Sequence, residues 1–312
     1  MLSRIAESMF WIGRYVERAD HTARMVQTQL RVIAEDTSRD EAEACRNLLA
    51  LMSIRISPDL PEPTASDLLR LLCWDAAEPT SIFHSWAAAR DNARRAREVI
   101  PLEVWESINT TWQKLPTRRF NVVRAYSFLD WARDRSALVQ GLARSTMVRD
   151  DGWQFFLLGR CLEQIDMTSR MVASASPTTG SANWPSVLRG VGGYDAFLRT
   201  YKGLYTDVEA AEFLLVDARF PRSVMHGLVA AQQCLAKVTL ANPSRTEKSV
   251  EAAQLLGRLR ARLEYTPTQE ILNGLDDEMN GVQGVSAAVA EVIDRTFFAA
   301  ADQTDWIREG TR

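Results

Sequence analysis

Two segments of this chain, 146 residues apart, carry nearly the same charged residues at helical spacing. Residues 10–26 and 156–172 are identical at nine of 17 positions. At 100° per residue, the shared charged residues of each segment fall on one stripe of a helix. The stripe contains Phe10, Gly13, Arg14, Glu17, Asp20 and Arg24 in the first segment and Phe156, Gly159, Arg160, Glu163, Asp166 and Arg170 in the second. The opposite face keeps only its apolar character. The stripe therefore requires particular chemical groups, whereas a core requires only volume.

The stripe combines cations, carboxylates and a glycine, and it has two possible environments. Arg14 with Glu17 and Asp20 with Arg24 are spaced to pair within one helix, as on a solvated face. A helical glycine costs about 1 kcal/mol relative to alanine, so Gly13 indicates that another backbone or a ligand comes close. We therefore expect a stripe that is at least partly buried. Buried Arg, Glu and Asp side chains either lock two helices together or line a polar cavity for a charged ligand.

The two copies differ at two positions that bear on catalysis. Arg18 and His21 of the first copy are replaced by Gln164 and Met167 in the second. His21 lies one turn after Glu17, where a carboxylate favours the protonated imidazole. This pair suits general acid and base catalysis, or it is a structural hydrogen bond.

A third candidate site is a group of arginines in the first half. Arg90, Arg94 and Arg97 lie within about 60° of one another on a helix. Such a group can clamp a phosphate or a carboxylate through paired N–H donors. The alternative is a solvated face tied by local ion pairs. The corresponding part of the second half lacks the arginines, so such a site would be asymmetric.

A second match predicts that the repeat is larger than one helix. Eight positions between residues 72 and 89 recur 142 residues later in the same order, including Pro79, Ser81 and His84 as Pro221, Ser223 and His226. We therefore expect two related halves, 1–148 and 149–312, which form one compact unit. Because His84 and His226 occur in both halves, we expect a structural role for them, such as a bond to a loop carbonyl.

The chain shows helical periodicity throughout and no sustained alternation of β-branched residues. The fold class is predicted as all-α, with two pseudo-symmetric helical bundles packed as one body. In the first half, the expected helices run from Ser3 to about Arg39, over a short second helix, over Asp67–Ala77, from Ser81 through Ile100, from Pro101 to about Leu115, and from a cap at Asn121 to Met147. In the second half, a helix begins at Asp151 and breaks at Ser174–Pro185. Further helices are expected near 186–203, 206–217, 223–241, 247–264 and 268–301.

Composition excludes several classes of function. The 312 residues carry a net charge of −3, which does not favour nucleic acid or an anionic membrane surface. Four scattered cysteines predict reduced thiols without a disulfide. The absence of a long apolar run or a leader leads us to expect a cytoplasmic protein. There is no phosphate-binding loop, dinucleotide fingerprint or metal-ligand spacing, so we expect no cofactor and no metal.

Several motifs together resemble the alpha-E family, a set of all-helical bacterial proteins with a Glu-Arg motif. They are the opening Met1–Ala19, Ala89–Arg94, Trp105–Asn109, Gly152-Trp153 and Pro221–Val224. The motif would be Glu17-Arg18, and the second copy departs from it as Glu163-Gln164. The resemblance implies that such a protein is encoded with, or fused to, a circularly permuted ATP-grasp amide ligase. It also implies a transglutaminase-like peptidase and the proteasome-related particle Anbu as neighbours.

These observations leave three hypotheses for the function. The first is a non-catalytic partner or scaffold of an ATP-grasp amide or peptide ligase, which presents a Glu/Arg-lined surface or pocket. The second is a stand-alone enzyme that acts on a peptide or aminoacyl substrate through the charged pocket. The third is a purely structural helical protein. The candidate binding residues are Arg14, Glu17, Arg18, His21, Arg24, Arg90, Arg94 and Arg97, and the structural repeat positions are Glu163, Asp166, Arg170, His84 and His226.

Overall fold

The computed structural model describes residues 2–35, 40–56, 62–115, 122–177, 183–202, 206–241 and 246–298. Within these ranges every regular element is a helix, which confirms the all-α fold class. The helices up to residue 146 are α1 (Ser3–Glu35), α2 (Glu41–Leu51), α3 (Ala65–Leu69), η1 (Arg70–Trp74), α4 (Ile82–Arg95), α5 (Leu102–Gln113) and α6 (Val122–Thr146). Those that follow are α7 (Asp151–Ala173), α8 (Trp184–Val191), α9 (Tyr194–Thr200), α10 (Asp207–Leu215), α11 (Val224–Ala241), α12 (Thr246–Tyr265), α13 (Thr268–Asn273), α14 (Leu275–Ile293) and η3 (Asp294–Phe298).

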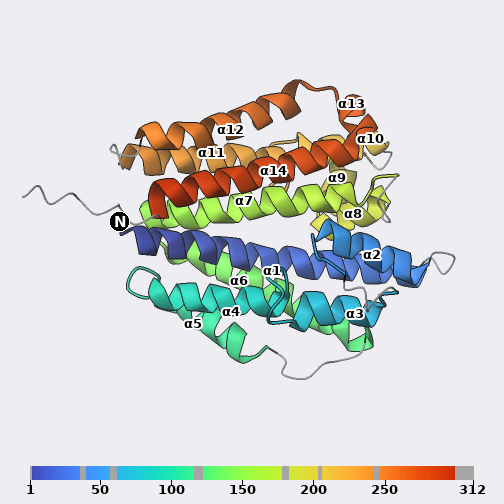
Figure 1. Ribbon diagram of the computed structural model, residues 1–312, viewed down its shortest axis with the longest axis horizontal. Coiled ribbons are helices and arrows are strands. Elements are labelled where there is room, and N and C mark those ends of the chain that lie inside the picture. The colour runs from blue at the N-terminus through green and yellow to red at the C-terminus, as the bar shows by residue number, and fades with distance from the viewer. Residues whose placement is uncertain are drawn as a thin grey trace, which may run out of the picture.

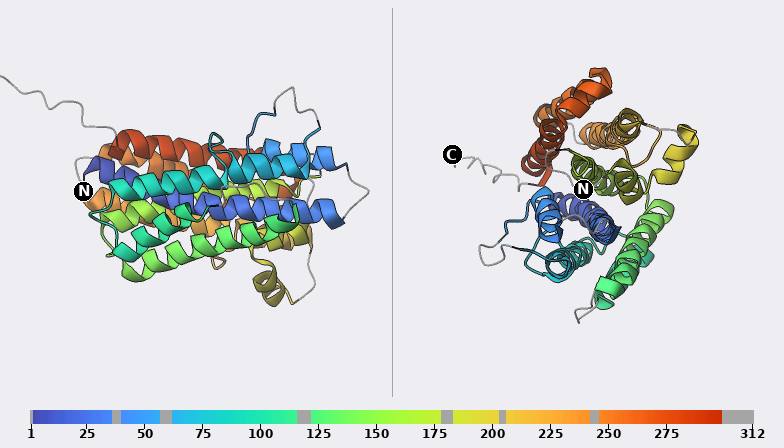
Figure 2. Two further views of the ribbon diagram at one scale, coloured as in Figure 1. Left: turned by 90° about the horizontal axis from the view of Figure 1, so that it is seen from below. Right: turned by 90° about the vertical axis from the view of Figure 1, so that its right-hand side faces the viewer.

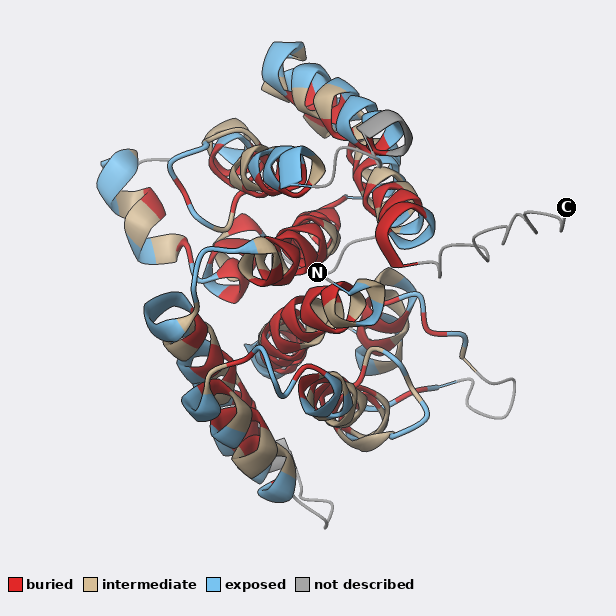
Figure 3. Cartoon of the chain, turned by 90° about the vertical axis from the view of Figure 1, so that its left-hand side faces the viewer, coloured by how far each residue is buried: buried red, intermediate tan, exposed pale blue. Residues whose placement is uncertain are grey.

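Helices α1 and α7 lie side by side at the centre of the molecule. Elements α1 to α6 occupy one side of it and α7 to α14 the other, with the long helices running lengthwise (Figures 1 and 2). Helix α1 packs against α7, α4 and α6, while α7 packs against α1, α11 and α14. Both central helices are buried on most of their surface, and the outer helices expose one face (Figure 3). Polar groups on the central helices must therefore find partners inside the protein.

The two central helices touch backbone to backbone at the repeated glycines. A Cβ atom on Gly13 would lie 2.0 Å from the carbonyl oxygen of Phe156. Reciprocally, a Cβ atom on Gly159 would lie 2.0 Å from the carbonyl oxygen of Phe10. Only glycine permits this approach, as the sequence predicted from the cost of a helical glycine. Matched positions thus make matched contacts here, while duplication of the whole halves stays a prediction that a superposition of them would test.

Side-chain caps begin several helices at the predicted positions. The Ser81 hydroxyl accepts from the His84 N–H and begins α4, and Asp150 accepts from the Trp153 N–H and begins α7. Thr206 and Glu209 form a reciprocal capping box at the start of α10. These caps satisfy N–H groups that have no partner within the helix.

Glycines break two segments that we expected as single helices. The segment near 186–203 forms α8 and α9, because Gly192 adopts a left-handed φ of 79° after Val191 and ends α8. The described part of the segment near 268–301 forms α13, α14 and η3, with Gly274 between the first two, and the predicted end near 301 lies outside the described residues. The periodicity on both sides of each glycine had concealed the break.

Other predicted boundaries were also wrong. The helix expected through Ile100 ends at Arg95, and turns lead from there to Pro101. Pro101 explains only why Ile100, the residue directly before it, is not helical. The helix expected over Asp67–Ala77 begins earlier, at Ala65, and becomes a π-helix before ending at Trp74. The predicted end near Arg39 and the cap at Asn121 lie outside the described residues.

The four cysteines are buried and free, as the sequence predicted. Burial raises the pKa of the Cys161 and Cys73 thiols far above the usual range. These thiols therefore stay protonated and contribute to packing. Among the described helices, none combines the length and the apolarity that crossing a bilayer requires.

We predict that Gly13→Ala or Gly159→Ala destabilises the protein by about 2 kcal/mol or more, because the new methyl group would force two backbones apart. Gly141→Ala is the matched control. Gly141 also lies inside a helix, but a Cβ there would meet nothing within 4 Å, so the control should stabilise by up to about 1 kcal/mol. Chemical denaturation measures both changes, and equal effects at the two kinds of site would contradict the close contact.

Candidate functional site

The two charged stripes face each other across the contact between α1 and α7. The carboxylates of Glu17 and Glu163 are 0% and 1% exposed. An unpaired carboxylate this deep would be strongly destabilising. Each one is hydrogen-bonded to arginine side chains of the opposite helix, and the predicted burial of the stripe is confirmed for these two carboxylates.

Glu163 on α7 is held by two arginines of α1. Arg14 Nε donates to Oε2 at 2.7 Å, Arg18 Nε donates to Oε1 at 2.5 Å, and Arg18 Nη2 donates to Oε2 at 3.0 Å. Burial acts to raise the pKa of Glu163, but Arg18 and Arg14 outweigh it and lower the pKa to about 2. Glu163 is therefore a permanently ionised anchor and not a proton donor near neutral pH.

Glu17 on α1 makes the reciprocal contact with α7. Arg160 Nε donates to its Oε2 at 3.1 Å, and Gln140 Nε2 from α6 donates to the same oxygen at 2.6 Å. His21 Nε2 lies 3.1 Å from Oε1. Burial opposes ionisation, yet Arg160 and then His21 hold the pKa of Glu17 well below its usual range. The sequence suggested that Arg14 pairs with Glu17 on the same helix. Instead, both residues pair across the interface.

Asp20 is bridged by two guanidinium groups. Arg24 Nε donates to Oδ2 at 2.9 Å within α1, which agrees with the predicted spacing. Arg222 Nη2 donates to the same oxygen at 2.8 Å, from the loop that precedes α11. Burial acts to raise the pKa of Asp20, but Arg222 and Arg24 lower it. Asp20 is therefore a second buried, ionised carboxylate on α1.

Arg222 supplies the charge that the second copy of the repeat lacks. Gln164 stands where the first copy has Arg18, so α7 contributes one arginine fewer than α1. Under the 142-residue offset, Arg222 corresponds to the uncharged Thr80. The arginine is thus on the helix in one copy and on the following loop in the other. Two ion-pair clusters result, each with two carboxylates and three arginines. The first contains Glu17, Asp20, Arg24, Arg160 and Arg222, and the second contains Glu163, Asp166, Arg14, Arg18 and Arg170.

The loops that carry these residues are fixed by matching hydrogen bonds. Thr22 Oγ1 donates to the carbonyl of Thr80 at 3.1 Å, and Thr168 Oγ1 donates to the carbonyl of Arg222 at 3.2 Å. Likewise, His84 Nδ1 lies 3.0 Å from the carbonyl of Ala76, and His226 Nδ1 lies 2.9 Å from that of Ala218. These are the loop-carbonyl contacts that the repetition of the histidines suggested.

Asp166 and Arg170 continue the second stripe. Arg170 Nε donates to Asp166 Oδ2 at 2.9 Å. Arg170 Nη1 also donates to the carbonyl of Leu51 and, at 2.9 Å, to Ser53 Oγ. This arginine ties α7 to the end of α2, a contact that no pattern in the sequence indicated.

The outer edges of the second cluster border a cavity of about 300 Å³. Arg14, Arg18 and Arg170 line it on one side, and Ala287 and Ala290 of α14 line it on the other. Arg14 and Arg18 are 11% and 16% exposed, so they face the cavity while their inner donors hold Glu163. The sequence left open whether the stripe joins two helices or lines a cavity. In the structure the same arginines do both.

One group among the described residues has the spacing of metal ligands. Oxygen and nitrogen atoms of Glu17, Asp20 and His21 lie within 4.8 Å of one another. However, the Arg222 guanidinium is bound to Asp20, and its Nη1 is 4.0 Å from Glu17 Oε1 and 3.4 Å from His21 Nε2. A divalent cation would have to displace this guanidinium. The donor set thus fits its resident arginine better than a metal.

His21 is 0% exposed, and its Nδ1 has no hydrogen-bond partner among the described residues. A substrate therefore cannot touch His21 or Glu17 in this conformation. General acid and base catalysis requires such contact. The arrangement is suited to fixing two helices and to presenting guanidinium groups, but not to proton transfer.

The arginine group of α4 does not converge on one point. Arg90 Nε donates to Asn109 at 2.8 Å, with its guanidinium 4.2 Å from the centroid of the Trp112 ring. Arg97 lies beyond the end of α4 and stacks on Trp105 at 5.3 Å. Arg94 is exposed beside Asp91. Each side chain has its own neighbour, and none of the three lines the cavity beside Arg14.

Gln140 and Arg222 are partners of the buried carboxylates that the sequence did not predict. Both come from elements remote in sequence, so spacing along one helix could not reveal them. The difference between Thr80 and Arg222 is one of about ten between the two matched blocks, so it did not single out Arg222.

Comparison with known proteins identifies the family. A family model described as a predicted alpha-helical domain with a conserved ER motif, Alpha-E, matches residues 1–298. The chain belongs to the Alpha-E family. Glu17 and Arg18, the expected ER pair, thus each bind α7, Glu17 through Arg160 and Arg18 through Glu163.

Relatives of this Alpha-E chain occur in mycobacteria. Uncharacterised proteins of Mycobacterium bovis and Mycobacterium tuberculosis are 23% identical to it over 95% of its length. The chain spans only 37% of these relatives. No solved structure is significantly similar.

We predict that Glu17→Ala costs about 3–5 kcal/mol of stability, because it leaves Arg160 facing a cavity without its carboxylate. Glu106→Ala on α5 is the control, since that side chain is exposed and its loss should change stability by less than about 0.5 kcal/mol. Thermal and urea melts measure both. If Glu17→Ala changes the stability as little as the control does, the charged stripe is exposed to solvent.

The ion pairs also predict a dependence of stability on pH. The pKa of Glu163 falls from the ordinary 4.5 to about 2 on folding, so its contribution is complete above pH 4.5 and is lost as the pH falls toward 2. In that window each such carboxyl contributes a slope of up to about 1.4 kcal/mol per pH unit. Urea melts between pH 2.5 and 6 should show a shallower slope for Glu163→Gln than for the wild type. Identical slopes would exclude Glu163 as a source.

Proposed function

We propose that this Alpha-E protein is a non-catalytic partner of an ATP-grasp amide or peptide ligase. It presents the outer, arginine-lined edge of its central ion-pair cluster to the ligase or to the ligase's substrate. One observation carries the proposal. Glu163 is buried and bound by Arg14 and Arg18, and these arginines keep one edge on a cavity of about 300 Å³, which Arg170 and its 15% exposed partner Asp166 also line.

This arrangement favours binding over chemistry. A binding site for an anionic group needs cationic donors at a fixed position, which Arg14, Arg18 and Arg170 provide. Aromatic rings hold two of these guanidinium groups from the side, with Arg14 5.5 Å from the Trp11 ring and Arg18 5.5 Å from the Tyr15 ring. An enzyme would also need an accessible proton acceptor or nucleophile. The carboxylates nearest to these arginines already accept hydrogen bonds from guanidinium groups, so they are not available as proton acceptors.

The identity of the partner rests on the family. Alpha-E membership brings the expectation of an ATP-grasp ligase as genetic neighbour or fused domain, and of a transglutaminase-like peptidase and an Anbu particle nearby. The greater length of the mycobacterial relatives leaves room for a fused domain. An ATP-grasp partner would supply the nucleotide chemistry for which this sequence carries no motif.

We predict that the purified protein neither hydrolyses ATP nor forms amides alone, and that it co-purifies with an ATP-grasp ligase encoded beside it. The decisive experiment co-expresses the two proteins with a tag on the ligase only, and then measures ATP turnover with and without the Alpha-E protein. Ligation or peptide hydrolysis by the isolated wild type, lost in His21→Ala, would instead establish the stand-alone enzyme.

Two variants locate the contact. Ala287→Arg fills the mouth of the cavity with a long side chain, and it should reduce co-purification severalfold while the melting temperature stays unchanged. Gly281→Arg adds the same side chain on α14 where a Cβ meets nothing within 4 Å, and it should have no effect. If both variants co-purify with the ligase as the wild type does, the ion-pair cluster only holds α1 and α7 together. Replacement of Arg90, Arg94 and Arg97 by glutamine tests these three arginines in the same assay.

A further inference from the structure

The two copies of the repeat differ in what binds the aspartate of each ion-pair cluster. In the first cluster, Arg24 Nε and Arg222 Nη2 both donate to Asp20 Oδ2, at 2.9 and 2.8 Å, and the Asp20 side chain is only 3% exposed. The matching carboxylate of the second cluster is Asp166. Among the described residues it accepts from Arg170 alone, and its side chain is 15% exposed. Asp166 thus lacks the second N–H donor that its counterpart has.

The second cluster has Thr80 at the position that corresponds to Arg222. The two backbones are placed alike, since the Thr80 carbonyl accepts from Thr22 at 3.1 Å and the Arg222 carbonyl accepts from Thr168 at 3.2 Å. Thr80 and Asp166 both line the cavity of about 300 Å³ beside the second cluster. A threonine side chain is too short to cross this space. The cavity therefore corresponds to the space that the Arg222 guanidinium fills in the first cluster.

Arg14 gives the same cavity a pair of N–H donors. Its Nε donates to Glu163 Oε2 at 2.7 Å, and its two Nη nitrogens have no hydrogen-bond partner among the described residues. Arg14 lines the cavity and is 11% exposed. Two guanidinium nitrogens match the two oxygens of a carboxylate. The cavity thus combines an acceptor at Asp166 with donors at Arg14.

The charges around the cavity disfavour a ligand that carries charge of one sign only. Its lining contains three cations and two carboxylates, and a third carboxylate accepts from Thr80 at its edge; these residues are Arg14, Arg18, Arg170, Glu163, Asp166 and Glu78. A simple cation would meet the three arginines, and a polyanion would meet the carboxylates. A ligand with one group of each sign satisfies both ends of the cavity.

The rest of the lining is largely apolar. It consists of Met52, Met167, Ala287 and Ala290, together with Ser286. Ser286 Oγ already donates to the carbonyl of Leu162 at 3.0 Å. An aliphatic group of a ligand would bury apolar surface against this wall. The volume lies at the lower limit of small-molecule sites, which suits a molecule as small as one amino acid and not a nucleotide.

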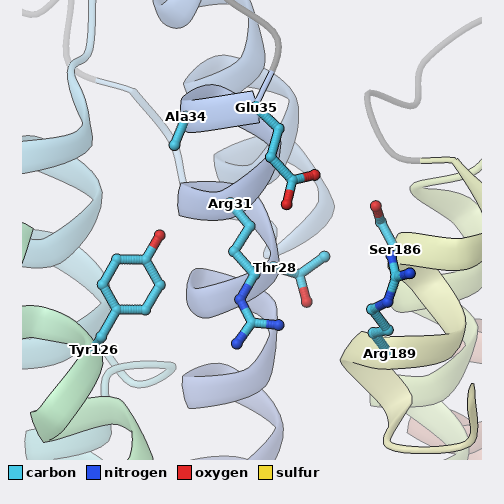
Figure 4. A pocket seen from close by; sticks show the side chains of 7 residues that line it. All are labelled: Thr28, Arg31, Ala34, Glu35, Tyr126, Ser186 and Arg189. Carbon is cyan, nitrogen blue, oxygen red and sulfur yellow. The ribbon is translucent and has the colours of Figure 1, made fainter. Parts of the chain in front are cut away.

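A larger cavity of about 610 Å³ lies farther along α1, where Arg31 lies between Tyr126 of α6 and Arg189 of α8 (Figure 4). Its lining residues lie outside the two matched blocks of the repeat. The repeat therefore provides no filled counterpart that would indicate its ligand. The cavity beside Asp166 has such a counterpart.

We propose that the cavity beside Asp166 binds a free α-amino acid with an aliphatic side chain. The ammonium group donates to Asp166, as the Arg222 guanidinium donates to Asp20 in the first copy. The carboxylate accepts from the Nη groups of Arg14, and the side chain packs on Met52 and the alanines of α14. The inference deepens the ligase-partner proposal and rests on it for the use of the ligand, because an amino acid carries both groups that an amide ligase joins.

The test is isothermal titration calorimetry of the isolated protein with L-alanine, L-valine and L-leucine. The wild type should bind at least one of them. Isocaproate is leucine without its amino group, and isoamylamine is leucine without its carboxyl group. Each should bind at least about tenfold more weakly than leucine, because each loses one charged hydrogen-bonded contact. The proposal is overturned if none of the three amino acids binds, or if either analogue binds as tightly as leucine.

Two variants locate the binding site. Thr80→Arg gives the second copy the side chain that fills the first, and it should weaken amino-acid binding at least about tenfold with an unchanged circular dichroism spectrum. Thr146→Arg is the matched control at an exposed threonine of α6 and should leave the affinity within twofold. Ala287→Arg closes the cavity from an exposed position on α14 and should also weaken binding. Equal affinities in all three variants would place the amino acid elsewhere and overturn the proposal.

The amino-acid site and the ligase-partner proposal fail in different experiments. Calorimetry uses the isolated protein, whereas the ligase is tested by co-purification. Co-purification without amino-acid binding would overturn the site and leave the ligase as partner. Amino-acid binding at this cavity without co-purification would support the site and remove the ligase.

Discussion

The contact between the backbones of α1 and α7 determines the rest of the structure. At Gly13 and Gly159 each helix lies directly against a carbonyl oxygen of the other, with no side chain between them. Helices separated by ordinary side chains would lie 8–10 Å apart. The close approach lies directly beside Arg14 and Arg160, each the neighbour of a glycine, and each of them binds a carboxylate on the opposite helix. The glycines set the distance, and the charges set the register.

Charge is balanced in two different ways around this contact. In the first copy of the repeat the additional arginine is on the helix as Arg18, and in the second it is on the loop as Arg222. Buried ion pairs do not by themselves argue for high stability, because desolvation offsets much of the Coulomb attraction. They do penalise any shift that leaves one member alone. The paired carboxylates thus specify how the two helices meet more than how strongly they hold.

Part of this arrangement is readable from the sequence, and part is not. The repeated glycine inside a polar stripe predicted a close approach, and helical periodicity predicted the fold class. Local spacing misled at Arg14, because a three-residue separation from Glu17 permits a pair within the helix that the interface replaces. Gln140 and Arg222 could not be assigned, since their neighbours come from helices brought together only by folding. The breaks at Gly192 and Gly274 depend on backbone conformation, which periodicity does not report.

The reciprocal pairs have a consequence for how the molecule comes apart. Glu17 and Glu163 at the centre are each neutralised by arginines of the other half of the chain, so neither half can unfold alone without stranding a buried charge in its neighbour. The free energy of that charge couples the two halves into one cooperative unit, although each has about the length of an independent domain. A chain cut between α6 and α7 would give two fragments that are each poorly folded alone. Together they would assemble as a heterodimer, with the glycine contact as its interface.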